Sequence, residues 1–218
     1  MNERKKFLNE VRTNISSMGH DNDLKLQSLE WISSSLKYKY CYNFEWMGRP
    51  IIQLPQDMVA VQELIWSVKP DLVIETGIAH GGSLVLSASI LALLEYSDAL
   101  ENGEALDPNT PKRKVLGIDI DIRRHNREAI EAHPMSNRIK MIEGSSISAD
   151  IISKVKKAAA PFKKIMVFLD SNHTHDHVLK ELEAYAELTS IGSYCIVFDT
   201  LIEDVDDKYN LNKPWQIG

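Results

Sequence analysis

Residues 71–83 read DLVIETGIAHGGS, a short apolar run that ends in an acid and leads into three glycines. The apolar run predicts a strand buried on both faces of a parallel sheet. Residues 83–94, SLVLSASILALL, follow it and predict a buried helix. A strand, a glycine turn and a helix make up the unit that binds nucleotides, because the glycines let a ligand approach the backbone and the first helical N–H groups face that ligand.

The spacing of the glycines limits this interpretation. Gly77, Gly81 and Gly82 follow a G-x3-G-G pattern, whereas dinucleotide-binding folds use G-x-G-x-x-G. The pattern therefore does not single out a pyrophosphate. A tight connection between strand and helix explains the turn equally well, and both interpretations stay open from this stretch alone.

Length and composition favour an ordinary α/β domain. The chain has 218 residues, enough for one domain with a full core, and its formal net charge of -6 argues against a nucleic-acid partner. The apolar helix at 84–94 is too short to span a membrane. We expect no signal peptide, since residues 1–10 are charged and no apolar core follows them. Cys41 and Cys195 do not predict a disulfide, so we expect a cytoplasmic protein without a membrane partner.

A regular alternation of elements continues after this stretch. Further strands and helices are expected in turn at residues 115–120, 123–132, 139–142, 150–159, 165–169, 177–188 and 193–198. Such alternation implies right-handed crossovers and an open parallel sheet covered by helices on both sides. The polar stretch 97–114 interrupts it and is expected to be a surface insertion.

The chain before this pattern is expected to be an extension. We divide it into an N-terminal helical and irregular part, 1–56, and a core, 57–218. Residues 2–40 have helical spacing with a break at 18–20, and Asp57 is expected to cap the first core helix. Packing against the sheet and forming a lid or subunit contact both stay open as roles for the extension.

Four of the predicted strands end in an acid. These acids are Glu75, Asp119, Asp170 and Asp199. Ligands of open parallel sheets bind outside the carboxyl ends of the strands, so the four carboxyl groups should converge on one edge. A single acid in such a place is commonly a helix cap, but four together indicate an active site.

The residue types at this edge suggest particular chemistry. Asp119 stands where an acid can accept hydrogen bonds from two ribose hydroxyls. Asp170 and Asp199 offer the oxygen ligands that Mg2+ prefers. His173 lies three residues beyond Asp170 and could take a proton from a hydroxyl held at the same edge.

The run HTHDH leaves other interpretations open. Its three histidines, His173, His175 and His177, could contribute to a two-histidine, one-carboxylate iron site. Against this, alternate histidines on a helix point apart. In the simpler alternative, His175 and His177 serve the first turn of the helix.

Several segments together resemble the cephalosporin hydroxylase family over roughly residues 44–199. They are EWMGRPIIQLPQD, KPDLVIETGIAHGGS, LGIDIDIR, IEGSS, FLDSNHTHDHVLKELEAY and GSYCIVFDT. That family has the Rossmann-like, doubly wound fold of class I S-adenosylmethionine-dependent methyltransferases. The chain is also similar to metal-dependent sugar O-methyltransferases of macrolide pathways. The resemblance implies a Mg2+-assisted O-methyltransferase for a hydroxyl of a small molecule or sugar.

The resemblance also implies roles for individual residues. Asp170 and Asp199 match metal ligands, and His173 matches the base. The methionine end of the cofactor would be held by Glu75, Gly77, Gly81 and Ser83. Asp119 would hold its ribose, and Ser145 would lie near its adenine.

The sequence departs from these relatives in two places. Phe198 stands where they have the first member of an acidic pair, which implies a weakly bound metal, a substitute ligand such as Glu203, or no metal. We also expect the C-terminal hairpin of the class to be missing, which implies either a truncated product or a sheet that another subunit completes. A five-stranded sheet with an exposed edge favours a homo-oligomer or poor stability. A cofactor-binding but catalytically silent protein is therefore the alternative, and a hydroxylase is a third.

Overall fold

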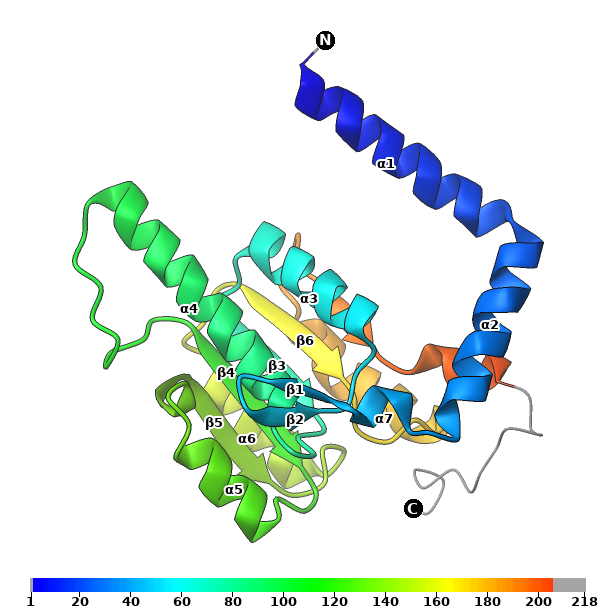
Figure 1. The fold of residues 1–218 in the computed structure, drawn as a ribbon. Helices are drawn as coiled ribbons and strands as arrows, with labels where there is room; N and C mark the ends of the chain where they lie inside the picture. Colours follow the sequence, from blue (N-terminus) through cyan, green and yellow to red (C-terminus); the bar gives the residue numbers. More distant parts are fainter. Residues whose placement is uncertain (1, 206–218) are drawn as a thin grey trace. The chain divides into compact units, whose positions relative to one another are not determined.

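A five-stranded parallel sheet with the order β5-β4-β3-β6-β7 is the centre of the core (Figure 1). The computed structural model describes residues 2–205, except for the side chains of residues 202 and 203. The strands are β3 (Leu72–Thr76), β4 (Lys114–Asp119), β5 (Ile139–Glu143), β6 (Ile165–Leu169) and β7 (Cys195–Val197). The order places the strand of the glycine stretch in the middle and confirms the predicted doubly wound sheet.

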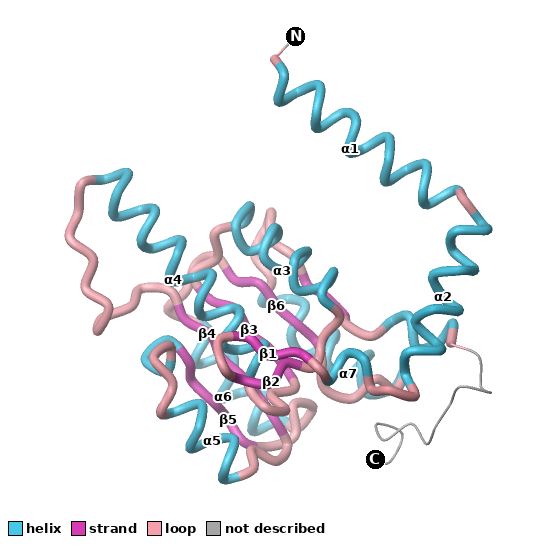
Figure 2. The backbone as a smooth tube through the Cα atoms, in the orientation of Figure 1, coloured by secondary structure: helices cyan, strands magenta, loops and turns pink. Residues whose placement is uncertain are grey.

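Helices cover both faces of the sheet, as Figure 2 shows. They are α3 (Pro55–Val68), α4 (Gly82–Asn102), α5 (Arg124–Glu131), α6 (Ala149–Ala159) and α7 (His175–Tyr185). Helices α3, α4 and α5 share an apolar core with Val73 and Val115, whereas α6 and α7 share another with Ile74 and Leu116. Successive strand residues face opposite sides, which explains why the strands are apolar throughout.

Helix α4 is longer than the sequence patterns predicted. It has 21 residues and includes 97–102, which were expected to belong to the surface insertion. That segment contains neither proline nor glycine, and Gly103 ends the helix in the left-handed conformation with φ 65°. Among residues 2–205, α4 is the one helix long and apolar enough to cross a membrane, although 61% of its apolar window is buried in the protein. The predicted helix length was therefore wrong, and the absence of a membrane partner stays a prediction.

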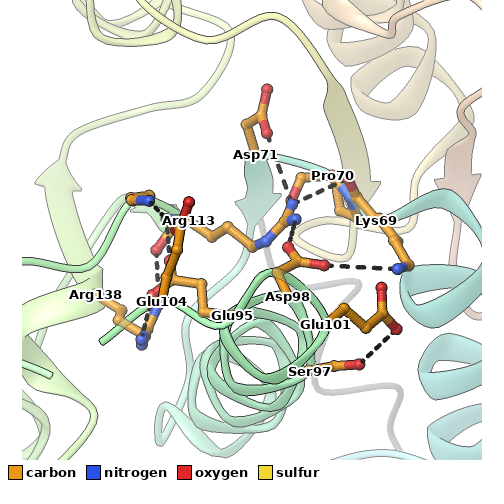
Figure 3. Close-up of polar contacts among 11 residues, drawn as sticks. Lys69, Pro70, Asp71, Glu95, Ser97, Asp98, Glu101, Glu104, Arg113 and Arg138 are labelled. Atoms are coloured by element: carbon orange, nitrogen blue, oxygen red, sulfur yellow. Dashed lines mark hydrogen bonds and ion pairs between the residues drawn. The ribbon is translucent and has the colours of Figure 1, made fainter. Parts of the chain in front are cut away.

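An ion-pair network ties the amino end of the sheet to the C-terminal half of α4 (Figure 3). Arg113, just before β4, donates to Asp98 Oδ2 at 2.6 Å and to two backbone carbonyls just before β3. Arg138, just before β5, pairs with Glu95 at 2.8 Å, and the two side chains are only 5% and 7% exposed. These contacts fasten Arg113, the last residue before β4, and the C-terminal half of α4 at the end of the sheet opposite to the predicted acids.

A short hairpin lies where irregular chain was expected. Strands β1 (Phe44–Trp46) and β2 (Arg49–Ile51) pair in antiparallel fashion. The two residues between them, Met47 and Gly48, both have positive φ, which is typical of two-residue hairpin turns. The hairpin packs on α4, where Trp46 Nε1 donates to Ser89 Oγ at 3.0 Å.

The chain divides into two compact units, of which the larger is Cys41–Thr200 and the other contains Met1–Tyr40. The smaller unit holds α1 (Glu3–His20) and α2 (Asn22–Leu36), and Asp21 caps α2 by accepting from Leu24 N at 2.9 Å. This confirms the helical spacing, while the break lies at Asp21, just beyond the predicted residues 18–20, which belong to α1. The boundary at residue 56 and the role of the extension stay predictions, and the C-terminal hairpin concerns residues 206–218, outside the described residues.

Candidate active site

The carboxyl ends of the strands lie level with one another. Thr76, the last residue of β3, pairs with Ile118 of β4 and with Leu169 of β6. The acid that ends β4 and the acids that follow β6 and β7 therefore lie at one edge of the sheet, as predicted. Glu75 differs slightly from the prediction, because it lies inside β3 and not beyond its end.

Asp170, His173 and Asp199 come together at this edge. Each offers one potential ligand atom, and these atoms all lie within 4.8 Å of one another. His173 Nε2 lies 3.2 Å from Asp199 Oδ2. Asp199 has φ 57°, a left-handed conformation that is uncommon outside glycine and is often found at functional sites.

The carboxyl groups here oppose one another's ionisation. Burial raises the pKa of Asp170 well above its usual range, and the charges of Asp199 and Glu75 raise it further, while a hydrogen bond from Gln53 lowers it. Burial likewise raises the pKa of Asp199 and that of Asp57, and Asp199 adds to the rise at Asp57. Crowded, desolvated carboxylates of this kind favour a bound cation, which relieves their repulsion.

Sequence reasoning missed two members of this environment. Asp57 was predicted to cap α3, but the helix begins at Pro55 with Leu54 at the N-cap, so that prediction was wrong. Gln53 is 8% exposed, and its Oε1 has no hydrogen-bond partner within the described part of the chain. The one signal for both residues was their place in a segment that carries the family resemblance.

Glu75 is a buried carboxyl group with one unsatisfied oxygen. It is 1% exposed, its Oε1 accepts a hydrogen bond from Ser83 Oγ, and its Oε2 has no partner among residues 2–205. Burial raises the pKa of Glu75 to about 8, and the bond from Ser83 opposes this rise. An ammonium group beside Oε2 would satisfy the unpaired oxygen.

Asp119 holds the glycine turn. Its Oδ2 accepts from Ile78 N at 2.7 Å and from Ala79 N at 3.2 Å, and its Oδ1 accepts from Asp121 N at 3.1 Å. A carboxylate has about four acceptor positions, so about one remains for a ribose hydroxyl. The interpretation from the sequence required two.

The glycines of the turn are required by the packing of the protein itself. A Cβ atom on Gly77, where φ is +89°, would overlap the backbone of Asp170 and lie 2.7 Å from its carbonyl carbon. A Cβ atom on Gly81, where φ is +85°, would lie 2.5 Å from Ile130 Cγ1. These contacts favour the tight-connection interpretation for both positions.

Ser145 follows β5, and its backbone oxygen accepts from Ser148 Oγ at 2.8 Å. Its neighbour Ser146 was not singled out in the sequence, yet it is buried in a polar network with α7. His177 belongs to this network, because its Nε2 lies 3.2 Å from Ser146 Oγ. The interpretation of His177 as a residue that serves only the helix start was therefore wrong.

The other histidine and acid alternatives can also be compared with the structure. In the described residues a single histidine, His173, joins the carboxylates, while His175 is exposed, so no two-histidine iron site forms there. Phe198 packs edge-to-face on Phe168, with ring centroids 5.7 Å apart, and borders the apolar core. The side chain of Glu203, the suggested substitute ligand, lies outside the description.

The strand order, the helices on both faces and the level carboxyl edge define the Rossmann-like fold of class I S-adenosylmethionine-dependent methyltransferases. Residues 38–218 match the family model described as Rhamnosyl O-methyltransferase/CmcI, and the chain belongs to that family. The match confirms the resemblance seen in the sequence.

Several known proteins are similar to this chain. Rhamnosyl O-methyltransferase of Mycobacterium tuberculosis (strain ATCC 25618 / H37Rv) is 29% identical over 161 residues, which are 72% of this chain and 57% of that protein. The Mycobacterium leprae (strain TN) protein of the same name is 27% identical over 156 residues, 71% of this chain and 59% of the relative. The chain thus spans less than two thirds of these relatives.

The fold also has a counterpart among solved structures. The structure of a "putative caffeoyl-CoA O-methyltransferase" from Staphylococcus aureus has a TM-score of 0.52 at 16% sequence identity. The similarity covers 92% of this chain and 75% of that one. At this level of identity the similarity concerns the fold alone.

Proposed function

We propose that this protein is an S-adenosylmethionine-dependent O-methyltransferase that acts on a hydroxyl of a small molecule or sugar. The observation that carries the proposal is the grouping of Asp170, His173 and Asp199 at the carboxyl edge of the sheet, in a chain of a methyltransferase family. The name of the relatives supports a sugar acceptor. A homo-oligomeric state and a cytoplasmic location stay predictions.

The cofactor would supply the methyl group that the acceptor oxygen attacks. Glu75 supports this assignment, because its buried Oε2 lacks a partner and suits the ammonium group of the methionine part. Ser83 would hold Glu75 in place, and Asp119 would offer its remaining acceptor position to the ribose. Ser145 would lie near the adenine.

Asp170 and Asp199 would hold Mg2+, which would lower the pKa of the acceptor hydroxyl. The donor set fits this ion, because two carboxylates whose pKa values are both raised by burial gain from a nearby cation. Phe198 removes a third carboxylate, so water and the acceptor would complete the coordination shell.

His173 would remove the proton of the acceptor hydroxyl. When its Nε2 donates to Asp199, which lies 3.2 Å away, Nδ1 is the nitrogen that remains to accept a proton. Asp199 then orients the ring and stabilises the positive charge that the ring gains. Desolvation and alignment of the two reacting groups would supply much of the remaining rate.

The test is the variant His173→Ala. We expect its turnover to fall about 10²- to 10⁴-fold, because general-base catalysis contributes this much, while affinity for S-adenosylhomocysteine stays near that of the wild type. Labelled S-adenosylmethionine with a panel of rhamnosides and other glycosides measures transfer, and calorimetry measures affinity. His175→Ala is the matched control, since His175 is exposed in the same segment. Unchanged turnover in His173→Ala would contradict the proposed base.

Phe198 favours a second candidate, a protein that binds the cofactor without transferring its methyl group. Its ring fills apolar space beside Phe168. The resemblance to metal-dependent sugar O-methyltransferases implies an acid at this position. Under this alternative the wild type would bind S-adenosylhomocysteine, yet Mg2+ would increase neither acceptor binding nor transfer across the panel. A Mg2+-dependent gain in acceptor binding would favour the enzyme.

A further inference from the structure

A buried polar network joins two loops of the proposed site through α7. Glu181 is 0% exposed, and its Oε1 accepts from Ser146 Oγ at 2.5 Å and from Ser171 Oγ at 2.7 Å. His177, one turn earlier, places its Nε2 3.2 Å from each serine oxygen and 3.4 Å from Glu181 Oε1. The Tyr185 hydroxyl donates to the backbone carbonyl of Ser146.

Counting donors and acceptors fixes the direction of these hydrogen bonds. Both serine hydroxyls donate to Glu181 Oε1, so their oxygen lone pairs are left to accept from the Nε2–H of His177. The network therefore requires an acceptor at the side chain of Glu181. Replacement of that acceptor would release both serines at once.

The network has a cost that packing alone does not explain. Glu181 Oε2 is buried and has no hydrogen-bond partner in the part of the chain that the structure describes. An unsatisfied buried carboxylate oxygen is unfavourable, and an apolar side chain could fill similar space without this cost. An apolar side chain, however, could not accept the two hydrogen bonds that Glu181 Oε1 accepts from Ser146 and Ser171.

The two serines lie on different sides of the proposed site. Ser146 follows β5 directly after Ser145, the residue proposed to lie near the adenine. Ser171 follows β6, between Asp170 and His173. A single carboxylate oxygen therefore connects the cofactor side of the site to the loop that carries the proposed base.

We propose that Glu181 is a positioning residue for methyl transfer, which fixes the distance between the loops after β5 and β6 through Ser146 and Ser171. This inference rests on the proposed function. The two arms of the network act on different steps: the Ser146 arm acts mainly on cofactor affinity, and the Ser171 arm acts mainly on the placement of His173.

The experiment compares four variants for their Kd toward S-adenosylhomocysteine and for kcat at saturating cofactor. Ser146→Ala removes the hydrogen bond to Glu181 and should act mainly on cofactor binding. We expect Kd to rise about 5- to 10-fold, which corresponds to the free energy of one hydrogen bond. Ser171→Ala should act mainly on the reaction and lower kcat about 10-fold or more, because small misplacements of a reacting group are costly. Glu181→Ala should show both effects. Glu181→Gln, whose amide oxygen can accept both bonds, should recover most of the loss.

Glu183→Ala is the matched control, since Glu183 lies on the same helix and is exposed. Circular dichroism and the thermal midpoint report folding for each variant. A merely structural role would lower the thermal midpoint without separating Kd from kcat, and this outcome would overturn the proposal. Wild-type Kd and kcat in both serine variants would overturn it also, even if Glu181→Ala did not fold. If the wild-type chain itself binds no S-adenosylhomocysteine, the proposed function fails, whereas normal wild-type behaviour with unaffected variants removes only the role of Glu181.

Discussion

At the scale of single residues, Glu75 has a direct thermodynamic consequence. Burial raises its pKa in the folded protein to about 8 from the usual 4.5, so the folded state holds a proton that the unfolded state has lost between these values. The resulting destabilisation is absent at low pH, grows as pH rises, and is complete above about pH 8. We expect Glu75→Gln to remove this part of the pH dependence, which has a slope of up to about 1.4 kcal/mol per pH unit.

Urea unfolding between about pH 5 and pH 8.5 measures the difference between the two proteins. That difference contains the titration of Glu75 and the part of the Asp170 pKa that the Glu75 charge raises, since both are absent from Glu75→Gln. Glu63→Gln, an exposed change on α3, is the control and should follow the wild type. Parallel stability curves for the wild type and Glu75→Gln would show that Glu75 does not titrate as its burial requires.

At the scale of elements, the contact between β3 and β6 depends on Gly77. Gly77→Ala would combine a left-handed backbone with overlap against the backbone of Asp170, and we expect a loss of about 2–5 kcal/mol in the free energy of unfolding. Gly192 has a similar φ of +78° with no atom within 4 Å of its missing Cβ, so Gly192→Ala should cost only about 1–2 kcal/mol. Chemical denaturation measures the free energy of unfolding of Gly77→Ala and Gly192→Ala against the wild type. If both variants lost the same free energy of unfolding, the chain after β6 would have to make room for the new Cβ atom at residue 77 without cost, which would contradict this prediction.

The elements themselves were largely predictable. Continuous apolar runs fix the parallel strands, since both faces of each strand are covered, and the acids beyond them followed from the strand ends. The length of α4 and the β1-β2 hairpin were not predicted. Polar residues such as 97–102 continue a helix when nothing breaks it, and Met47 gives no sign of its positive φ.

Residues of the candidate site were predictable only where a polar side chain comes directly after a strand in the sequence. Asp170 and His173 stand close in sequence, and the register brings Asp199 to them. Ser146 and Glu181 are 35 residues apart and meet only through the packing of α7, a contact that no periodic pattern encodes. The position of Asp119 at the end of β4 was predicted. Its bonds to the turn were not, because they depend on the backbone conformation of that turn.

At the scale of the whole core, the two ends of the sheet have different tasks. The carboxyl end holds crowded carboxyl groups with raised pKa values, an arrangement that costs stability and suits chemistry. At the amino end the charges are matched, as in the pairs Arg113 with Asp98 and Arg138 with Glu95. Stability and activity should therefore respond to separate sets of residues.

The pair of Glu95 and Arg138 tests this separation. Glu95→Leu leaves the guanidinium of Arg138 buried without its partner, which should lower the free energy of unfolding by about 3–5 kcal/mol. The double variant Glu95→Leu/Arg138→Met should recover part of that loss, because replacing both members of a buried ion pair with apolar side chains is often nearly neutral. The rest remains, because Glu95 Oε1 also accepts from the backbone N–H of Arg113 at 2.5 Å, and neither new side chain offers an acceptor. In both proteins, at a temperature where each is folded, Kd for S-adenosylhomocysteine and kcat should stay within about twofold of the wild type, since the sheet separates this pair from the carboxyl edge. A large fall in kcat in the folded double variant would show instead that the two ends are coupled through α4.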